Sequence, residues 1–163
     1  MSTPRAFVLQ LFWAASLAAL GGYWVARGAL APGASADWGL DAREWLRWGS
    51  AALYVAAWWW ARSRVMNGLA ARASRSWQVL AESDRRALSG RLFAASMVAV
   101  ALPEAPVLLG LLNSAVGSPA PRLFEWTLGA TAVMLLWLRV TMIPAVCDAL
   151  AKLATDGTRS HTR

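Results

Sequence analysis

The most constraining feature of the sequence is a run of 21 residues, Ala6–Ala26, that contains no charged side chain. A helix rises about 1.5 Å per residue and the hydrocarbon core of a bilayer is about 30 Å thick, so about 20 apolar residues are needed to cross it. The run is therefore long enough to span a membrane. The whole chain is 58% hydrophobic and only 15% charged, whereas about 25% of the residues of a soluble domain are charged.

Three further segments are apolar enough to be spans. Residues 92–116 contain one charge, Glu104, residues 123–147 contain Glu125 and Arg139, and residues 45–62 end shortly after three consecutive tryptophans. Backbone polar groups inside lipid must be satisfied within their own segment, so each span should be a helix. The sequence predicts an all-α integral membrane protein with transmembrane helices at about 6–26, 45–62, 92–116 and 123–147. Residues 1–163 would form one transmembrane domain, with a mobile polar tail at 148–163.

The distribution of arginine predicts the topology. Residues 62–91 carry seven arginines and two acidic residues, whereas residues 27–44 carry two arginines and three acidic residues. The positive-inside rule places residues 62–91 and both termini in the cytoplasm. The alanine- and arginine-rich composition with short loops is typical of a bacterial inner membrane protein. Alternatively, Ala34-Ser35-Ala36 is a signal-peptide cleavage site, which would remove residues 1–36 and leave three spans with the same cytoplasmic loop.

The basic segment has a helical pattern of its own. From Val65 to Leu80 apolar residues recur every three or four positions, which indicates one face of a helix. In one interpretation the segment lies on the inner leaflet. In the other, which we favour, it continues the second span and forms a long basic helical hairpin with the helix that enters the third span. Six arginines are candidate contacts to anionic lipid: Arg62, Arg64, Arg72, Arg75, Arg85 and Arg86. The simpler interpretation is that these arginines only fix the topology.

Several classes of chemistry lack the residues they need. One cysteine, Cys147, and one histidine, His161, cannot form an internal disulfide, a cysteine-based metal cage or a multi-histidine site. The net charge of +7 comes mainly from arginines beside apolar runs, which suits a membrane surface better than nucleic acid. We therefore expect no enzyme activity, cofactor, metal or nucleic acid. The expected partners are the lipid bilayer and either another membrane protein or further copies of this chain.

Glu104 is the charged residue that most needs an explanation. It is the thirteenth of the 25 residues of its span, which predicts a position near the bilayer midplane. An ionised carboxylate there costs about 2.5–3.5 kcal/mol on insertion scales, so it should be protonated, paired or facing a wet cavity. Pro103 and Pro106 flank it, and each removes a helical N–H donor. The freed carbonyls could hold a cation or water, as in the broken helices of transporters.

Arg139 is the obvious counter-charge for Glu104. If residues 92 and 147 mark the inner boundary, Glu104 lies about 18 Å and Arg139 about 12 Å from it, and the short connection at 117–122 makes the two spans neighbours. A structural Glu104–Arg139 ion pair is one interpretation. The second is an ion or proton site formed by Glu104, Arg139, Asn113, Pro103 and Pro106. The third is a bound partner whose own charge completes the site.

Residues 101–112 contain Ala-Leu-Pro-Glu-Ala-Pro followed by Leu-Leu-Gly-Leu-Leu. This stretch resembles the carboxylate-bearing helix of the proteolipid (c) subunits of rotary ATPases, which carries a glutamate at lipid depth. The resemblance implies that Glu104 is a proton or sodium site. It covers only these residues, and the glycine-rich partner helix of that family has no counterpart at 6–26 or 45–61. The chain is also similar to small, uncharacterised four-helix membrane proteins of bacteria.

Two functions remain in consideration. The first is a non-enzymatic accessory or assembly subunit of a membrane complex, in which Glu104 pairs with Arg139. The alternative is a small homo-oligomeric proton- or cation-coupled carrier, in which Glu104 is the titrating site. Four spans are few for a monomeric transporter, so the carrier would need several copies around a shared cavity.

Overall fold

The computed structural model describes residues 4–29, 40–73, 82–115 and 122–159. Every element within these ranges is helical, as the sequence predicts. The elements are α1 (Pro4–Ala29), α2 (Leu40–Trp60), the π-helical segment η1 (Ala61–Met66), α3 (Asn67–Ala73), α4 (Glu82–Ala101), α5 (Glu104–Ala115) and α6 (Leu123–Arg159).

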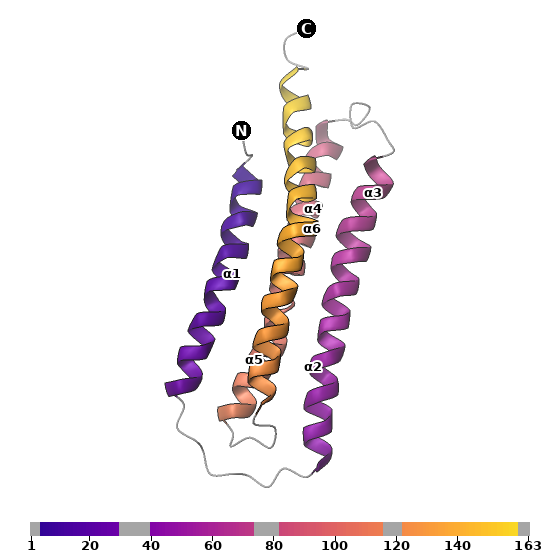
Figure 1. The fold of residues 1–163 in the computed structure, drawn as a ribbon. Coiled ribbons are helices and arrows are strands. Elements are labelled where there is room, and N and C mark those ends of the chain that lie inside the picture. Colours follow the sequence, from indigo (N-terminus) through magenta and orange to yellow (C-terminus); the bar gives the residue numbers. More distant parts are fainter. Residues whose placement is uncertain (1–3, 30–39, 74–81, 116–121, 160–163) are drawn as a thin grey trace.

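The helices run side by side along one long axis (Figure 1). Helices α1 and α5 terminate at the same side of the bundle at which α2 and α6 begin, and we call this side the lower end, as drawn in Figure 1. The opposite side is the upper end. The central element is α6, which packs against α1, α4 and α5. By contrast, α2 packs mainly on α5 and more loosely on α4, and it reaches α6 through the hydrogen bonds of Tyr54. The core is apolar and includes Leu9, Val107, Phe124, Leu138 and Ile143.

Three helical segments are long and apolar enough to cross a membrane: Pro4–Ala29, Ser83–Ala115 and Leu123–Ala154. They include three of the predicted spans. The fourth, at 45–62, covers most of α2 and the first two residues of η1, and it is not among them. This segment is rich in tryptophan and tyrosine, whose polar N–H and O–H groups lower the hydropathy of residues with large apolar rings.

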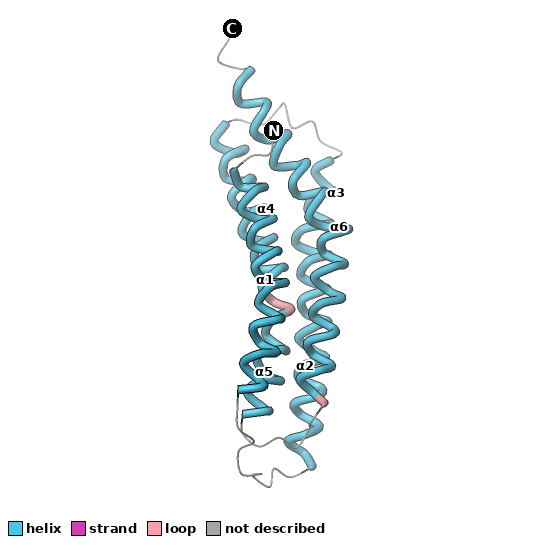
Figure 2. The backbone as a smooth tube through the Cα atoms, turned by 60° about the vertical axis from the view of Figure 1, so that its left-hand side comes forward, coloured by secondary structure: helices cyan, strands magenta, loops and turns pink. Residues whose placement is uncertain are grey.

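The predicted interruption by proline is present in the helix that carries Glu104. Helix α4 ends at Ala101 and α5 begins at Glu104, and Figure 2 shows the short break part-way along the bundle. Pro103 has no N–H to donate to the preceding turn, and neither has Pro106. At the break the N–H of Ala105 donates to the carbonyl oxygen of Leu102, at 3.2 Å.

The last helix is longer than the sequence predicts. Residues 148–163 were expected to form a mobile polar tail, but α6 continues to Arg159. Within this extension Ala149, Leu150 and Leu153 are buried, and their spacing of three and four residues puts them on one helical face. The extension therefore packs on the bundle, and in this region α6 contacts elements of the upper end instead of leaving the fold.

Candidate functional site

Glu104 is held by the end of the first helix. Its side chain is half-buried, and its Oε2 atom accepts a hydrogen bond from the hydroxyl of Tyr23 on α1, at 3.0 Å. Glu104 is also the first residue of α5, where the positive end of the helix dipole favours a carboxylate. A neutral donor and a helix N-terminus thus stabilise the carboxylate.

The contact with Tyr23 also locates Glu104 along the bundle. Arg5 and Arg27 flank the charge-free part of α1, and their 22-residue separation corresponds to about 33 Å, close to the thickness of the hydrocarbon core. Tyr23 precedes Arg27 by four residues, or about 6 Å. The carboxylate therefore lies toward the lower end of the bundle, about 6 Å from the level of Arg27, and its depth in a membrane stays a prediction. The prediction assigned residues 92–116 to the whole bilayer thickness, whereas the helical segment runs from Ser83 to Ala115.

The predicted ion pair between Glu104 and Arg139 is not formed within the part of the chain that the structure describes. The hydroxyl of Thr131 on α6 donates to the carbonyl oxygen of Pro103, at 2.7 Å, so Glu104 lies level with Thr131. Arg139 follows Thr131 by eight residues, which is about 12 Å along the helix. Its side chain is exposed, and its guanidinium lies over the indole of Trp13, 5.5 Å from the ring centre. The ion pair was expected because residue 147 is the predicted membrane boundary of the last span, whereas α6 continues to Arg159.

A hydrogen-bonded network fills the break between α4 and α5. The hydroxyl of Tyr54 on α2 donates to the carbonyl oxygen of Thr127, at 2.6 Å, and lies 2.8 Å from Oγ1 of Thr131. Thr131 in turn donates to Pro103. A carbonyl at the break, which the sequence suggested as a cation ligand, is thus already an acceptor for a side chain. The sequence analysis missed Tyr54 and Thr131, although both are polar residues within apolar helices.

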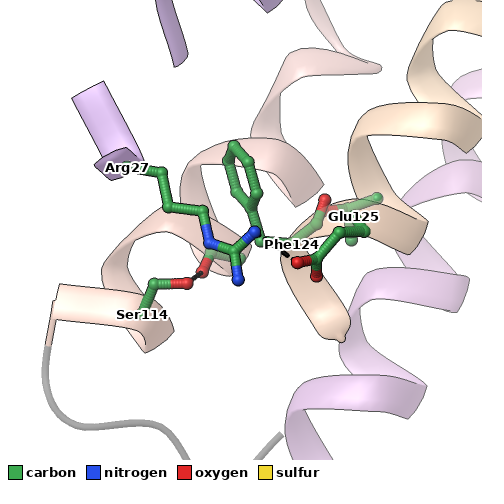
Figure 3. A network of polar contacts seen from close by, with 6 residues as sticks. Arg27, Ser114, Phe124 and Glu125 are labelled. Carbon is green, nitrogen blue, oxygen red and sulfur yellow. Dashed lines mark hydrogen bonds and ion pairs between the residues drawn. The ribbon is translucent and has the colours of Figure 1, made fainter. Parts of the chain in front are cut away.

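An ion pair closes the lower end of the bundle. Arg27 of α1 reaches across the ring of Phe124 to the carboxylate of Glu125 in the first turn of α6 (Figure 3). The guanidinium carbon of Arg27 lies 5.1 Å from the centre of the Phe124 ring and 5.9 Å from that of Trp24. Both charges are present in the sequence, but the ion pair between them could not be predicted. A single sequence does not give the register between α1 and α6.

The remaining predicted site residues are dispersed. Asn113 is buried on α5, nine residues after Glu104, which is about 13 Å along the helix. Pro106 is also buried. The structure thus does not gather Glu104, Arg139 and Asn113 around one point.

Four of the six predicted lipid-contact arginines are described, and they lie toward the upper end. The guanidinium of Arg62 stacks on the ring of Trp58 at 5.3 Å, and that of Arg64 stacks on Trp60 at 5.6 Å. Arg85 is half-buried and Arg86 exposed, both early in α4. The other two predicted lipid contacts, Arg75 and the side chain of Arg72, lie outside the described part of the chain.

Two adjoining hollows lie between α2 and α6. The first has a volume of about 500 Å³ and includes Arg47 and Arg122 in its wall. The second, of about 890 Å³, is lined mainly by apolar and aromatic side chains. Tyr54, Trp126 and Ala130 line both hollows, which makes them one continuous groove. Glu104 lines neither of them.

In the described ranges, histidine, cysteine, aspartate and glutamate side chains form no cluster of three or more that could hold a metal ion. Comparison with protein-family models, with curated proteins and with solved structures finds no match for the chain.

Proposed function

We propose that the protein is a non-enzymatic accessory subunit that spans the membrane four times and binds a larger membrane protein through Arg139. The observation that carries this proposal is an exposed arginine at the middle of an apolar helix. Arg139 is the seventeenth of the 32 residues of the segment Leu123–Ala154. We place it in a bacterial inner membrane, with both termini and residues 62–91 in the cytoplasm.

The proposed fourth span is α2, continued by η1. This helix lies alongside α6 and begins at the same end of the bundle (Figure 1). Its outward side chains include Trp45, Val55 and Trp59, all exposed in the isolated chain. Side chains of this kind are more stable in lipid than in water. Because α2 packs along helices that we propose to span the membrane, it should lie in the same bilayer.

Lipid is a poor environment for Arg139. A charged side chain at the centre of a spanning helix costs about 2.5–3.5 kcal/mol on insertion scales, so such residues normally face protein or water. Trp13 covers one side of the guanidinium, and within the described ranges no ion pair joins Arg139 to a carboxylate of its own chain. A partner helix with an aspartate or glutamate at this depth would provide the missing charge.

The expected partner is a different protein and not a second copy. The exposed acidic residues of the described chain are Glu44, Asp84 and Asp148. Glu44 and Asp84 lie in the first turns of α2 and α4, near the ends of the bundle, and Asp148 pairs with Lys152 at 3.1 Å. Among the side chains that the structure describes, a parallel second copy therefore offers no free carboxylate at the depth of Arg139.

Substituting Arg139 should release the protein from its complex. In native membranes the wild-type protein should migrate with an assembly larger than the 17.6 kDa chain. Arg139→Gln should migrate as the free subunit, and Arg139→Lys should keep the complex because it keeps the charge. Blue native electrophoresis after mild solubilisation measures this. Arg91→Gln is the matched control, because Arg91 is also exposed but lies nearer the upper end of its apolar segment, Ser83–Ala115.

A second measurement locates the partner. Val140 is 76% exposed beside Arg139, and Val55 is 65% exposed on α2. A photoreactive amino acid at Val140 should crosslink a partner segment that contains an acidic residue, whereas the same probe at Val55 should not. Retention of the complex by Arg139→Gln, or crosslinks from Val55 alone, would contradict the proposal.

A second candidate function is a homo-oligomeric proton- or cation-coupled carrier with Glu104 as its titrating group. The observation in its favour is a half-buried carboxylate at a helix break. It ranks second because Tyr23 already donates to the carboxylate and because Glu104 lines neither hollow between α2 and α6.

Glu104→Gln distinguishes the two functions. The amide can still accept the hydrogen bond from Tyr23, so folding should change little, by less than about 1 kcal/mol. If the protein is an accessory subunit, its complex should persist and labelling by a carboxyl-specific carbodiimide should be weak before and after the substitution. Strong pH-dependent labelling that disappears in Glu104→Gln, together with lost ion flux into liposomes, would favour the carrier.

A further inference from the structure

The groove between α2 and α6 faces away from Arg139. Ala130 lines the groove and precedes Arg139 by nine residues, which at about 3.6 residues per turn places the two on opposite sides of α6. We propose that this groove binds one anionic phospholipid, with the phosphate between Arg47 and Arg122 and an acyl chain along the apolar part. The inference rests on the proposed membrane position of α2 but not on the proposed partner of Arg139, since it concerns a different face.

The lower part of the groove has the charge that a phosphate needs. Arg47 and Arg122 are both exposed and both line the first hollow. No acidic side chain lines that hollow, and within the described residues no carboxylate forms an ion pair with either arginine. Two guanidinium groups from different helices can each donate a pair of hydrogen bonds to one phosphate.

The two arginines lie at the depth of lipid headgroups. Arg122 directly precedes α6, and Arg47 lies in the second turn of α2. Both positions belong to the lower end, near the Arg27–Glu125 ion pair that closes it. Both guanidinium groups can therefore reach a headgroup phosphate in the leaflet at the lower end.

The rest of the groove has the character and length of an acyl-chain site. The second hollow is lined by Trp58, Val133, Met134 and Trp137, among others. Glu125 also lines it. Its Oε1 atom is paired with Arg27, whereas its Oε2 atom is buried with no hydrogen-bond partner among the described residues. From Arg47 to Trp58 the groove extends about 16 Å along α2, and one leaflet contributes about 15 Å of hydrocarbon.

The loose packing of α2 on α6 gives a reason for the groove. The two helices are joined by the hydrogen bonds of Tyr54 to Thr127 and Thr131, and on either side of Tyr54 the hollows remain between them. A soluble anion would use only the arginine end and leave the apolar hollow unfilled. A phospholipid fills both, and its acyl chain would replace the missing contacts between the helices.

The test measures lipid retained by the purified full-length protein in detergent micelles doped with phosphatidylglycerol or phosphatidylcholine. Native mass spectrometry counts the bound lipid. We expect the wild-type protein to retain one phosphatidylglycerol in preference to phosphatidylcholine. The double substitution Arg47→Gln and Arg122→Gln should reduce phosphatidylglycerol retention about tenfold, to the level of phosphatidylcholine. The matched control, Arg5→Gln with Arg91→Gln, removes the same charge nearer the other end and should retain the lipid.

A second variant tests the apolar part of the site. Gly129 lines the second hollow, and a Cβ atom added there would meet nothing within 4 Å. Gly129→Phe should therefore fold normally and fill the groove, so that neither lipid is retained. Gly21→Phe on α1 is its control, because a Cβ atom at Gly21 also has open space around it.

Three results would overturn the proposal. In the first, the arginine variant keeps its phosphatidylglycerol, so the groove does not select the headgroup. In the second, Gly129→Phe binds lipid like the wild-type protein. In the third, millimolar inorganic phosphate displaces the lipid as well as short-chain phosphatidylglycerol does, which would make the site one for a soluble anion.

Discussion

Gly110→Leu is expected to prevent stable folding of the bundle. A Cβ atom at Gly110 would lie 2.8 Å from Oγ1 of Thr127 and 3.0 Å from the Cα atom of Phe124. Backbone atoms cannot rotate away, so α5 and α6 would have to separate. Small-to-large substitutions in a packed core typically cost about 1–3 kcal/mol, and a clash with backbone puts leucine at or above the top of that range.

Thr127 cannot relieve the clash cheaply. Its hydroxyl donates to the carbonyl oxygen of Phe124, at 3.0 Å, and the side chain is buried. Gly110→Ala should therefore already destabilise the protein, by about 1–2 kcal/mol. Unfolding in mixed micelles of increasing SDS fraction, followed by circular dichroism, measures both variants.

Gly129→Ala is the matched control for Gly110. It lies on α6 with nothing within 4 Å of an added Cβ atom, and alanine has the higher helix propensity by about 1 kcal/mol. We expect Gly129→Ala to be neutral or slightly stabilising. Equal effects at the two glycines would show that α5 and α6 do not approach closely at Gly110.

Phe124→Ala is expected to destabilise the bundle by about 3 kcal/mol. The side chain is fully buried at the start of α6, its ring lies 6.2 Å from that of Trp24, and the guanidinium of Arg27 stacks on it. Deleting the ring leaves a cavity and removes the surface that orients Arg27 toward Glu125. In a membrane, van der Waals packing is a main force between helices, so the lost contacts account for most of the effect.

The control for this prediction is Phe7→Ala on α1, where the side chain is 54% exposed. A side chain that faces the surrounding solvent should contribute little, less than about 0.5 kcal/mol. The same SDS titration applies. Similar losses at Phe7 and Phe124 would indicate that the face of α1 carrying Phe7 is covered in the assembled protein.

The features that depend on local chemistry agree with the predictions from the sequence. The charge-free run at Ala6–Ala26 predicted α1, and Pro103 and Pro106 predicted the break between α4 and α5, because missing N–H donors interrupt a helix whatever surrounds it. The predicted end of the last helix, at residue 147, is too early, because the polar C-terminal part of α6 continues as a helix to Arg159. A buried stripe at Ala149, Leu150 and Leu153 outweighs the polar composition of that segment.

The sequence alone determined that this chain forms long apolar helices, because three of its apolar runs are long enough to cross a bilayer. Only the tertiary structure decided which charges meet. The sequence suggested Glu104 with Arg139, whereas the fold joins Glu104 to Tyr23 and Arg27 to Glu125. The physical reason is register: a shift of four residues between antiparallel helices separates Arg139 from Glu104 by about 12 Å along the bundle instead of the expected 6 Å. Packing at contacts such as Gly110 against Phe124 sets that shift, and no residue pattern within one helix contains it.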